Sequence, residues 1–219
     1  MLECVRFVNT WFTSNTYILS HTNYEDVWVI DPGDVQPVIQ WMNDHSKLTV
    51  SGILLTHAHF DHIYGVNLVL EPFPDSLVYT ANEYGKLLLS DAKKNASYYT
   101  DLGSIVISPS AQVSFYKEKT ELWPGEEMRV LYTPGHSDDS VCMLIGGMLF
   151  TGDTLIKDTR TVTKLKTGSV DKLRSTLDLL ESFRGQHLQV LAGHGESFAL
   201  DDYNLEKAIK KACDYGNEA

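Results

Sequence analysis

The chain contains few cysteines, no long unbroken hydrophobic run and fewer basic than acidic residues. Its 3 cysteines in 219 residues lie far apart without CxxC spacing, which argues against a disulfide framework or a thiolate zinc site and favours a reducing compartment. The strongest apolar run, residues 141–150, is interrupted by two glycines and is about half a membrane span. The first twelve residues carry polar and charged side chains where a secretion signal needs an apolar stretch. We therefore expect a cytoplasmic protein with no membrane partner.

The charge balance restricts the class of partner. The sequence has 18 lysines and arginines against 29 acids, a formal net charge of -11. Such a chain repels nucleic acid and anionic membranes unless its bases are locally concentrated. Its 43% hydrophobic and 21% charged residues are typical of a folded globular protein. With no repeat or linker, we expect a single domain over residues 1–219 and a small-molecule substrate; the sequence leaves the oligomeric state open.

Periodicity predicts a chain of alternating strands and helices. Short apolar or β-branched runs predict strands at residues 17–19, 27–30, 52–56, 77–79, 128–132, 141–145, 148–151 and 188–191. Apolar residues at helical spacing predict helices near residues 35–42, 83–91, 170–183 and 205–212, the third capped by Ser169. Residues 93–103 are polar, contain two tyrosines and have no clear assignment.

The most informative pattern is a cluster of metal-ligand residue types. His57, His59, Asp61 and His62 follow directly on the apolar run at residues 52–56. Packing three imidazoles and a carboxylate there without a ligand would require a hydrogen-bond partner for each, at a cost in stability. On an extended loop, alternate residues project to the same side, so the two outer members of His-x-His can hold one ion. Imidazole and carboxylate without thiolate favour Zn²⁺, iron or Mn²⁺ over a closed structural zinc site.

Three further polar residues occur in one shared context. His136, Asp153 and His194 each lie just past the carboxyl end of a predicted strand, and a glycine directly precedes each of them. Loops at that edge of a sheet converge, and open α/β sheets keep their sites there. The other histidines, His21, His45 and His187, lie outside every motif and are expected to face solvent.

These motifs together resemble the metallo-β-lactamase superfamily over residues 15–195. The segments that carry the resemblance are Asn15-Thr16-Tyr17, Asp31-Pro32-Gly33, Thr56-His57-Ala58-His59-Phe60-Asp61-His62, Thr133-Pro134-Gly135-His136, Thr151-Gly152-Asp153-Thr154 and Gly193-His194-Gly195. The resemblance implies an α/β fold, a four-layer αββα sandwich, with a dinuclear metal site between its two sheets.

The resemblance also assigns the ligands. It places His57, His59 and His136 on a first metal, and Asp61, His62 and His194 on a second. Asp153 is expected to bridge the two ions, and Asp61 is expected to serve as a catalytic residue besides being a ligand. Asp31 is expected to be a turn residue that supports a ligand. The implied cofactors are two Zn²⁺ ions, with iron or manganese as alternatives in one or both positions, and the implied nucleophile is a bridging hydroxide.

Within this superfamily the pattern favours the glyoxalase II group. True metallo-β-lactamases mostly carry a cysteine where this chain has Asp153, whereas the aspartate is similar to hydroxyacylglutathione hydrolases, which cleave thioesters. We therefore expect a metal-dependent hydrolase of a small thioester or ester. Two departures weaken the case for glutathione. The chain continues only briefly past His194, and the acids Asp138 and Asp139 follow His136, where they would discourage an anionic substrate.

A basic stretch later in the chain favours an anionic substrate, in contrast to the two acids after His136. Six of the 18 bases fall within residues 157–174, directly after Asp153, so this stretch is either a solvated loop or a receptor for an anionic tail. Arg160 and Lys164 are its candidate substrate contacts. Three alternatives to thioester hydrolysis stay open: an iron-dependent persulfide dioxygenase with a single iron, a phosphodiesterase or nuclease of the same fold, and a non-enzymatic member kept for binding.

Overall fold

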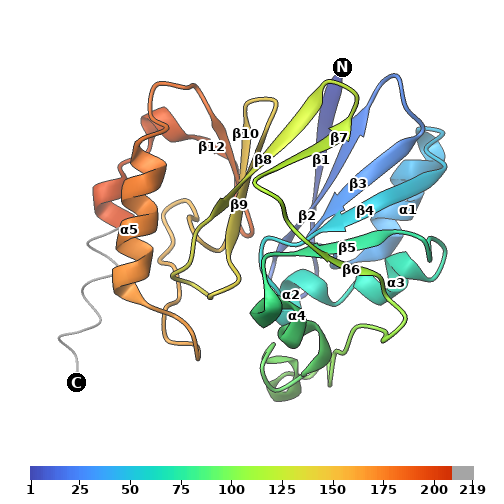
Figure 1. Cartoon of the computed structure of the whole chain (residues 1–219), viewed down its shortest axis with the longest axis horizontal. Helices are drawn as coiled ribbons and strands as arrows, with labels where there is room; N and C mark the ends of the chain where they lie inside the picture. Colours follow the sequence, from blue (N-terminus) through green and yellow to red (C-terminus); the bar gives the residue numbers. More distant parts are fainter. Residues whose placement is uncertain (209–219) are drawn as a thin grey trace. The chain divides into compact units, whose positions relative to one another are not determined.

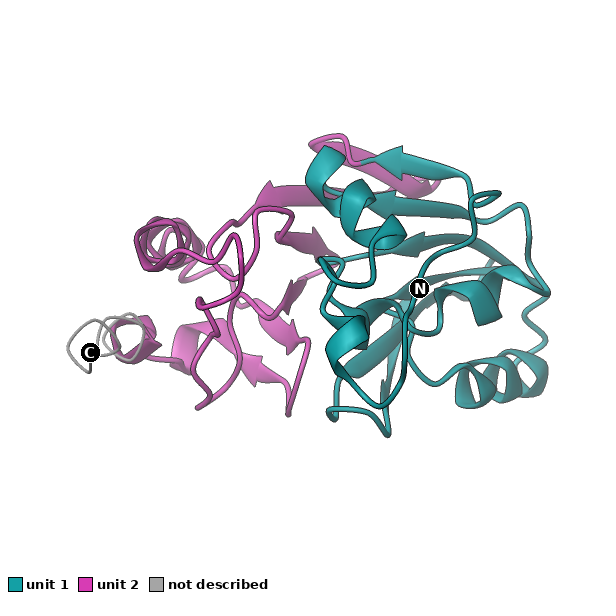
Figure 2. Cartoon of the chain, turned by 90° about the horizontal axis from the view of Figure 1, so that it is seen from below, with its two compact units in different colours: residues 1–115 teal, residues 116–219 magenta. Residues whose placement is uncertain are grey.

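A computed structural model describes residues 1–208, which fall into two compact units, residues 1–115 and residues 116 onward (Figure 2). The predicted helix at 205–212 is helical at residues 205–208, and its remainder lies outside the described residues, as does Cys213. Within the described part, no helix combines the length and the apolar character needed to cross a membrane. The single-domain expectation stays a prediction.

Unit 1 is built on one mixed six-stranded sheet in the order β1-β2-β3-β4-β5-β6 (Figure 1). The strands are β1 (Leu2–Val8), β2 (Asn15–His21), β3 (Asp26–Ile30), β4 (Thr49–Leu54), β5 (Leu77–Thr80) and β6 (Val113–Phe115). β1, β2 and β3 pair antiparallel, and β3 to β6 pair parallel. The carboxyl ends of the parallel strands therefore lie at one edge of the sheet. The Asp31-Pro32-Gly33 turn and the histidine motif at residues 57–62 come after β3 and β4 at this edge.

Helices cover one face of this sheet. They are α1 (Val35–Asp44), α2 (Phe60–Ile63), α3 (Val66–Leu70), α4 (Glu83–Ser90) and a short 3-10 turn, η1 (Ser97–Tyr99). Val35, Val38 and Met42 recur at helical spacing, so α1 buries one stripe against strand residues such as Val29 and Ile53. At α4, Asn82 accepts a hydrogen bond from the amide of Gly85, which caps the helix.

Unit 2 contains a second mixed six-stranded sheet, in the order β12-β11-β10-β9-β8-β7. Its strands are β7 (Lys119–Trp123), β8 (Glu126–Tyr132), β9 (Val141–Ile145), β10 (Met148–Gly152), β11 (Gln189–Ala192) and β12 (Phe198–Ala199), and its helices are α5 (Val170–Glu181) and η2 (Leu200–Asp202). The predicted Ser169 cap of α5 is confirmed, because its side chain accepts from the amide of Lys172. Leu173, Leu177 and Leu180 of α5 pack in one core with strand residues of the sheet.

The solvent-facing prediction is wrong for one of the three isolated histidines. His45 is exposed, and His187 is exposed beside Asp201, as expected. His21 is only 8% exposed. It is the last residue of β2, and its ring Nδ1 accepts from the amide of Asn23, while its carbonyl accepts from Lys47. The turn after β2 folds back against the imidazole and buries it. No pattern in the neighbouring sequence predicts this burial.

Candidate metal centre

One group of candidate ligands lies at the carboxyl edge of the parallel strands in unit 1. Register pairs Ile30 of β3 with Leu54 of β4, so the residues that follow both strands leave the sheet together. The amide of Asp31 donates to the carbonyl of Leu54 at 3.1 Å. Parallel pairing therefore places the Asp-Pro-Gly turn directly beside the histidine motif.

The histidine motif occupies the turn from β4 into α2, and its imidazole rings lie close together. The ring centroids of His57 and His59 lie 4.8 Å apart, and those of His57 and His62 lie 4.3 Å apart. His59 precedes the first residue of α2, so Asp61 and His62 fall in the first helical turn. Nε2 of His62 is 3.7 Å from Oδ2 of Asp61. All four side chains are largely buried, which is unusual for such a concentration of polar groups.

Asp31 supports the histidine motif through hydrogen bonds to Thr56 and His62. Its Oδ1 accepts from the amide of Thr56 at 2.8 Å, and its Oδ2 accepts from the Thr56 hydroxyl at 2.5 Å. The same Oδ2 is 3.0 Å from Nδ1 of His62. A carboxylate on one ring nitrogen of a histidine fixes the tautomer and leaves the other nitrogen to bind a metal. The expected supporting role of Asp31 agrees with this geometry.

A segment that the sequence left unassigned braces α2. The amide of Phe60 donates to the carbonyl of Asn95 at 3.0 Å. The side-chain amide of Asn95 donates to the carbonyls of Leu88 and Ile105, and its oxygen accepts from the amide of Ser97. Asn95 is fully buried, so this segment is held rigidly against the first turn of the helix that carries Asp61 and His62. Its polar composition gave no sign of this role.

A second group of candidate ligands lies in unit 2, at the ends of three strands that run in the same direction. β8 and β10 both pair antiparallel with β9, and β10 pairs parallel with β11. His136, Asp153 and His194 follow β8, β10 and β11 and so project at one edge of this sheet. The amide of Gly193 donates to the carbonyl of Gly152 at 2.8 Å, which ties the last two together.

Within unit 2, a carboxylate lies between two imidazoles. Oδ2 of Asp153 is 3.8 Å from Nε2 of His136, and its Oδ1 is 3.5 Å from Nε2 of His194. Nδ1 of His136 is 2.7 Å from the carbonyl of Val162, which leaves Nε2 directed toward Asp153. Each oxygen of the Asp153 carboxylate thus faces a different histidine, and a residue that bridges two metal ions needs such an arrangement.

The two acids after His136 do not stand as open charges. Asp139 is fully buried and accepts a short hydrogen bond from the Ser137 hydroxyl. Oδ1 of Asp138 is 2.6 Å from the ammonium of Lys172 at the start of α5. Asp139 is therefore buried away from the surface, and the charge of Asp138 is paired with that of Lys172. Both acids repel an anionic substrate less than the sequence suggested.

Arg160 and Lys164 lie on the same loop as the residue that supports His136. Residues 160–164 line a small cavity of about 120 Å³. Val162, whose carbonyl faces His136, lies between the two bases in sequence. The basic loop is thus connected to a candidate ligand within unit 2.

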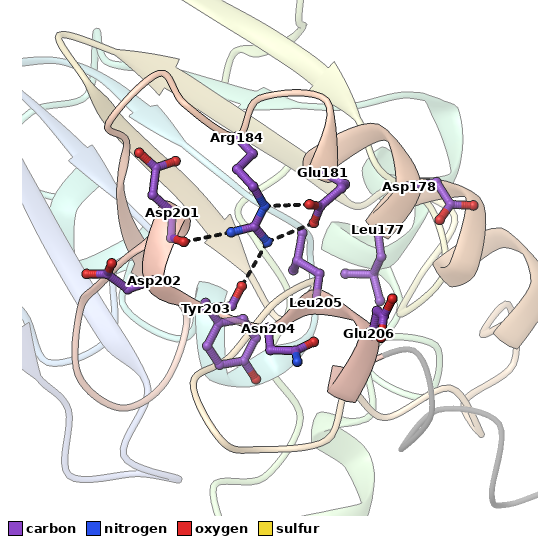
Figure 3. A pocket seen from close by; sticks show the side chains of 10 residues that line it. All are labelled: Leu177, Asp178, Glu181, Arg184, Asp201, Asp202, Tyr203, Asn204, Leu205 and Glu206. Atoms are coloured by element: carbon purple, nitrogen blue, oxygen red, sulfur yellow. Dashed lines mark hydrogen bonds and ion pairs between the residues drawn. The ribbon is translucent and has the colours of Figure 1, made fainter.

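A larger cavity in unit 2 does not contain any of the seven candidate ligands. Figure 3 shows this cavity of about 550 Å³, lined by Arg184, several acids and residues 203–206. The Arg184 guanidinium is engaged by Glu181 and by the carbonyls of Asp201 and Tyr203. Neighbouring groups of the same chain already pair with its charge, so the candidate chemistry stays with the histidine clusters.

The donor set in each unit fits a transition metal. In each unit a buried imidazole has its Nδ1 held by an oxygen, from Asp31 in one case and Val162 in the other, and its Nε2 beside a carboxylate. Metal-binding histidines are typically oriented in this way. Two mixed sheets flanked by helices, with histidine-rich metal-binding groups at the strand ends, define a metal-dependent α/β protein.

The chain belongs to the metallo-beta-lactamase superfamily, whose family model matches residues 9–186. A probable metallo-hydrolase of Streptococcus pyogenes serotype M6 is 30% identical over 205 residues, which are 91% of this chain and 87% of that protein. A hydroxyacylglutathione hydrolase of Pseudoalteromonas translucida is 30% identical over 151 residues, 69% of this chain and 50% of that protein. The chain spans about half the length of the hydroxyacylglutathione hydrolases that it matches.

Solved structures confirm the predicted fold class. The crystal structure of the BLEG-1 B3 metallo-beta-lactamase matches with a TM-score of 0.80 and 27% identity, over 90% of this chain and 94% of that chain. That of TTHA1623 in a di-iron-bound form matches with a TM-score of 0.74 and 26% identity over the same shares. The α/β class that the resemblance implied is confirmed, and the two six-stranded sheets with flanking helices have the metallo-beta-lactamase fold.

Proposed function

We propose that the chain is a metal-dependent hydrolase of a small thioester or ester, and that its histidine and aspartate ligand candidates bind two transition-metal ions. The observation that carries the proposal is the position of Asp153, whose two oxygens lie 3.8 Å and 3.5 Å from Nε2 of His136 and His194. A carboxylate that faces two imidazoles through different oxygens suits a bridge between two ions.

The remaining ligands follow from the donor chemistry and the family pattern. His57, His59 and His136 would hold the first ion, Asp61, His62 and His194 the second, with Asp153 shared. Zn²⁺ suits this imidazole and carboxylate set. Iron is the principal alternative, which the di-iron-bound relative supports, and manganese is a further one. When bound, divalent ions lower the pKa of water to about 7, which supplies a hydroxide at neutral pH.

The side chains of this protein supply orientation and proton handling. Asp31 holds the Nδ1 proton of His62, and the Val162 carbonyl holds that of His136. Asp61 is placed in the first turn of α2, where its carboxylate would accept a hydrogen bond from the attacking water and keep its lone pair directed at the carbonyl carbon. No serine or cysteine nucleophile is required.

Thioesters are favoured over the other substrate classes by the aspartate at position 153 and by the similarity to hydroxyacylglutathione hydrolases. Arg160 and Lys164 would receive an anionic tail on the thiol portion of such a substrate. Since Asp138 is paired with Lys172, it does not oppose this charge. Nucleic acid stays disfavoured by the net charge of -11.

The test is a substrate panel run on protein whose metal content has been measured in the same sample. We expect hydrolysis of small thioesters, weaker hydrolysis of lactones and none of phosphodiesters, with two metal ions per chain. Oxygen uptake with a persulfide would instead identify an iron-dependent dioxygenase. Phosphodiester cleavage without thioester cleavage would overturn the proposal, and so would a protein that binds no metal.

A further inference from the structure

The loop after Asp153 closes around the His136 turn at several points within unit 2. The carbonyl of Val162 is 2.7 Å from Nδ1 of His136. At the far end of the loop, the amide of Ser169 donates to the carbonyl of Gly135 at 2.8 Å. The loop thus contacts the residue before the histidine and the ring of the histidine itself.

A third contact depends on one side chain. The amide of Asp138 donates to Oγ1 of Thr167 at 3.0 Å. Oγ1 of Thr167 also lies 3.4 Å from the Ser137 hydroxyl, which donates to Asp139. With the Asp138 amide as donor and the Ser137 oxygen as acceptor, the Thr167 hydroxyl can use both its roles, and the chain of hydrogen bonds ends on a buried carboxylate.

A tight backbone turn at residues 165–168 holds the Thr167 hydroxyl in position. The amide of Gly168 donates to the carbonyl of Leu165 at 2.8 Å. A Cβ at Gly168 would lie 2.3 Å from the carbonyl oxygen of Thr163, so only glycine fits there. The turn that precedes α5 is therefore tightly closed, and Thr167 is held in place from both sides.

We propose that Thr167 is a positioning residue for His136, acting through the turn at residues 137–139 and through the loop that carries Val162. Its hydroxyl fastens the loop to the turn after His136, and so keeps the Val162 carbonyl in line with the imidazole. The same loop carries Arg160 and Lys164. The hydrogen bonds of Thr167 therefore fix the metal ligand His136 and the two substrate-binding bases relative to each other. This inference rests on the proposed role of His136 as a metal ligand.

A hydroxyl deletion tests the inference through metal affinity. The probe is Zn²⁺ alone, added to metal-free protein in competition with a chromophoric chelator, with Co²⁺ absorption spectra as a second readout of ligand geometry. We expect T167V to weaken one of the two metal equivalents about tenfold, within the range seen for groups that support metal ligands. The visible Co²⁺ bands of that equivalent should change, and T167S should restore both readouts.

The control is S182A, which removes an exposed hydroxyl of unit 2 that donates to the carbonyl of Leu179 at 2.6 Å at the end of α5. It should leave metal affinity and spectra unchanged. If T167V does not fold, T167A removes the same hydroxyl without adding a methyl group against the turn. Wild-type affinity and spectra in whichever hydroxyl-free variant folds would overturn the inference.

A separate variant distinguishes the inference from the proposed function. H136A should lose one metal equivalent. If H136A retains both metals, the ligand assignment itself is wrong. If H136A loses one and T167V binds both as the wild type does, only the positioning role of Thr167 is wrong.

Discussion

Oδ2 of Asp31 lies 3.0 Å from Nδ1 of His62, and the same carboxylate accepts both the amide and the hydroxyl of Thr56. One buried side chain thus joins the turn after β3, the end of β4 and the first turn of α2. Asp31 holds a positive φ of 48°, a conformation that costs a non-glycine residue free energy and that this network maintains.

Replacing Asp31 with alanine should weaken metal binding by roughly 10–100-fold, because the His62 ring loses the partner that fixes its orientation. Chelator competition on the metal-free protein measures the effect. Asp26 offers a matched control, since it lies at the opposite end of β3 and accepts from the Ser51 hydroxyl at 2.6 Å. D26N should bind metal as the wild type does. Equal affinities of D31A and the wild type would contradict the supporting role.

Removing the bases of the loop should affect substrate binding rather than the chemical step. R160A and K164A should each raise KM for a carboxylate-bearing thioester about threefold to tenfold with kcat nearly unchanged, because uniform binding is lost. A neutral thioester should show no such change, and added salt should reduce the difference. K86A, which removes an exposed lysine of α4 in unit 1, is the control. A fall in kcat without a change in KM would argue against anion recognition.

The buried amide of Asn95 should matter for stability as well as for the metal site. N95A removes a buried donor from the carbonyls of Leu88 and Ile105, which we expect to cost about 2 kcal/mol or more of unfolding free energy. Urea denaturation measures this loss. N67A removes an exposed amide that also makes two hydrogen bonds, to Val106 and Ser108, and should cost less. A smaller loss in N95A than in N67A would show that this segment is not a brace.

Alkaline pH should destabilise the protein through a buried thiol. Burial raises the pKa of Cys142 to about 12. Because the folded-state pKa lies above the ordinary value near 9, the contribution of this thiol is fully present below pH 9 and is lost as the pH rises toward 12. Urea denaturation across pH 8–11 should show a steeper decline in the wild type than in C142A. Identical pH profiles would mean that Cys142 does not titrate with unfolding.

Local patterns in the sequence predicted much of the fold because strands and helices here carry clear periodicity. Val35, Val38 and Met42 marked α1, and Ser169 marked the start of α5, as the structure confirms. β1 was missed because its charged residues, Glu3 and Arg6, interrupt the apolar run. It exists because all seven residues pair with β2, and such pairing is not visible in a local window.

The candidate ligands were predictable because their residue types and spacing are set by the chemistry of metal binding. Their supports were harder to find. Asn95, Thr167 and the carbonyl of Val162 act through backbone groups or through contacts distant in sequence, as between Thr167 and Asp138. Backbone carbonyls leave no signature in residue identity, so only the folded chain shows which of them face a histidine.

The central claim is that the chain is a dinuclear metallo-hydrolase, and the most direct test is elemental analysis of purified wild-type and D153A protein, with thioester hydrolysis assayed on the same samples. The account predicts about two transition-metal ions per wild-type chain, and loss of both metal and hydrolysis in D153A, because Asp153 faces both His136 and His194. Metal-free wild-type protein that still hydrolyses thioesters, or a D153A variant with unchanged metal content and activity, would contradict it.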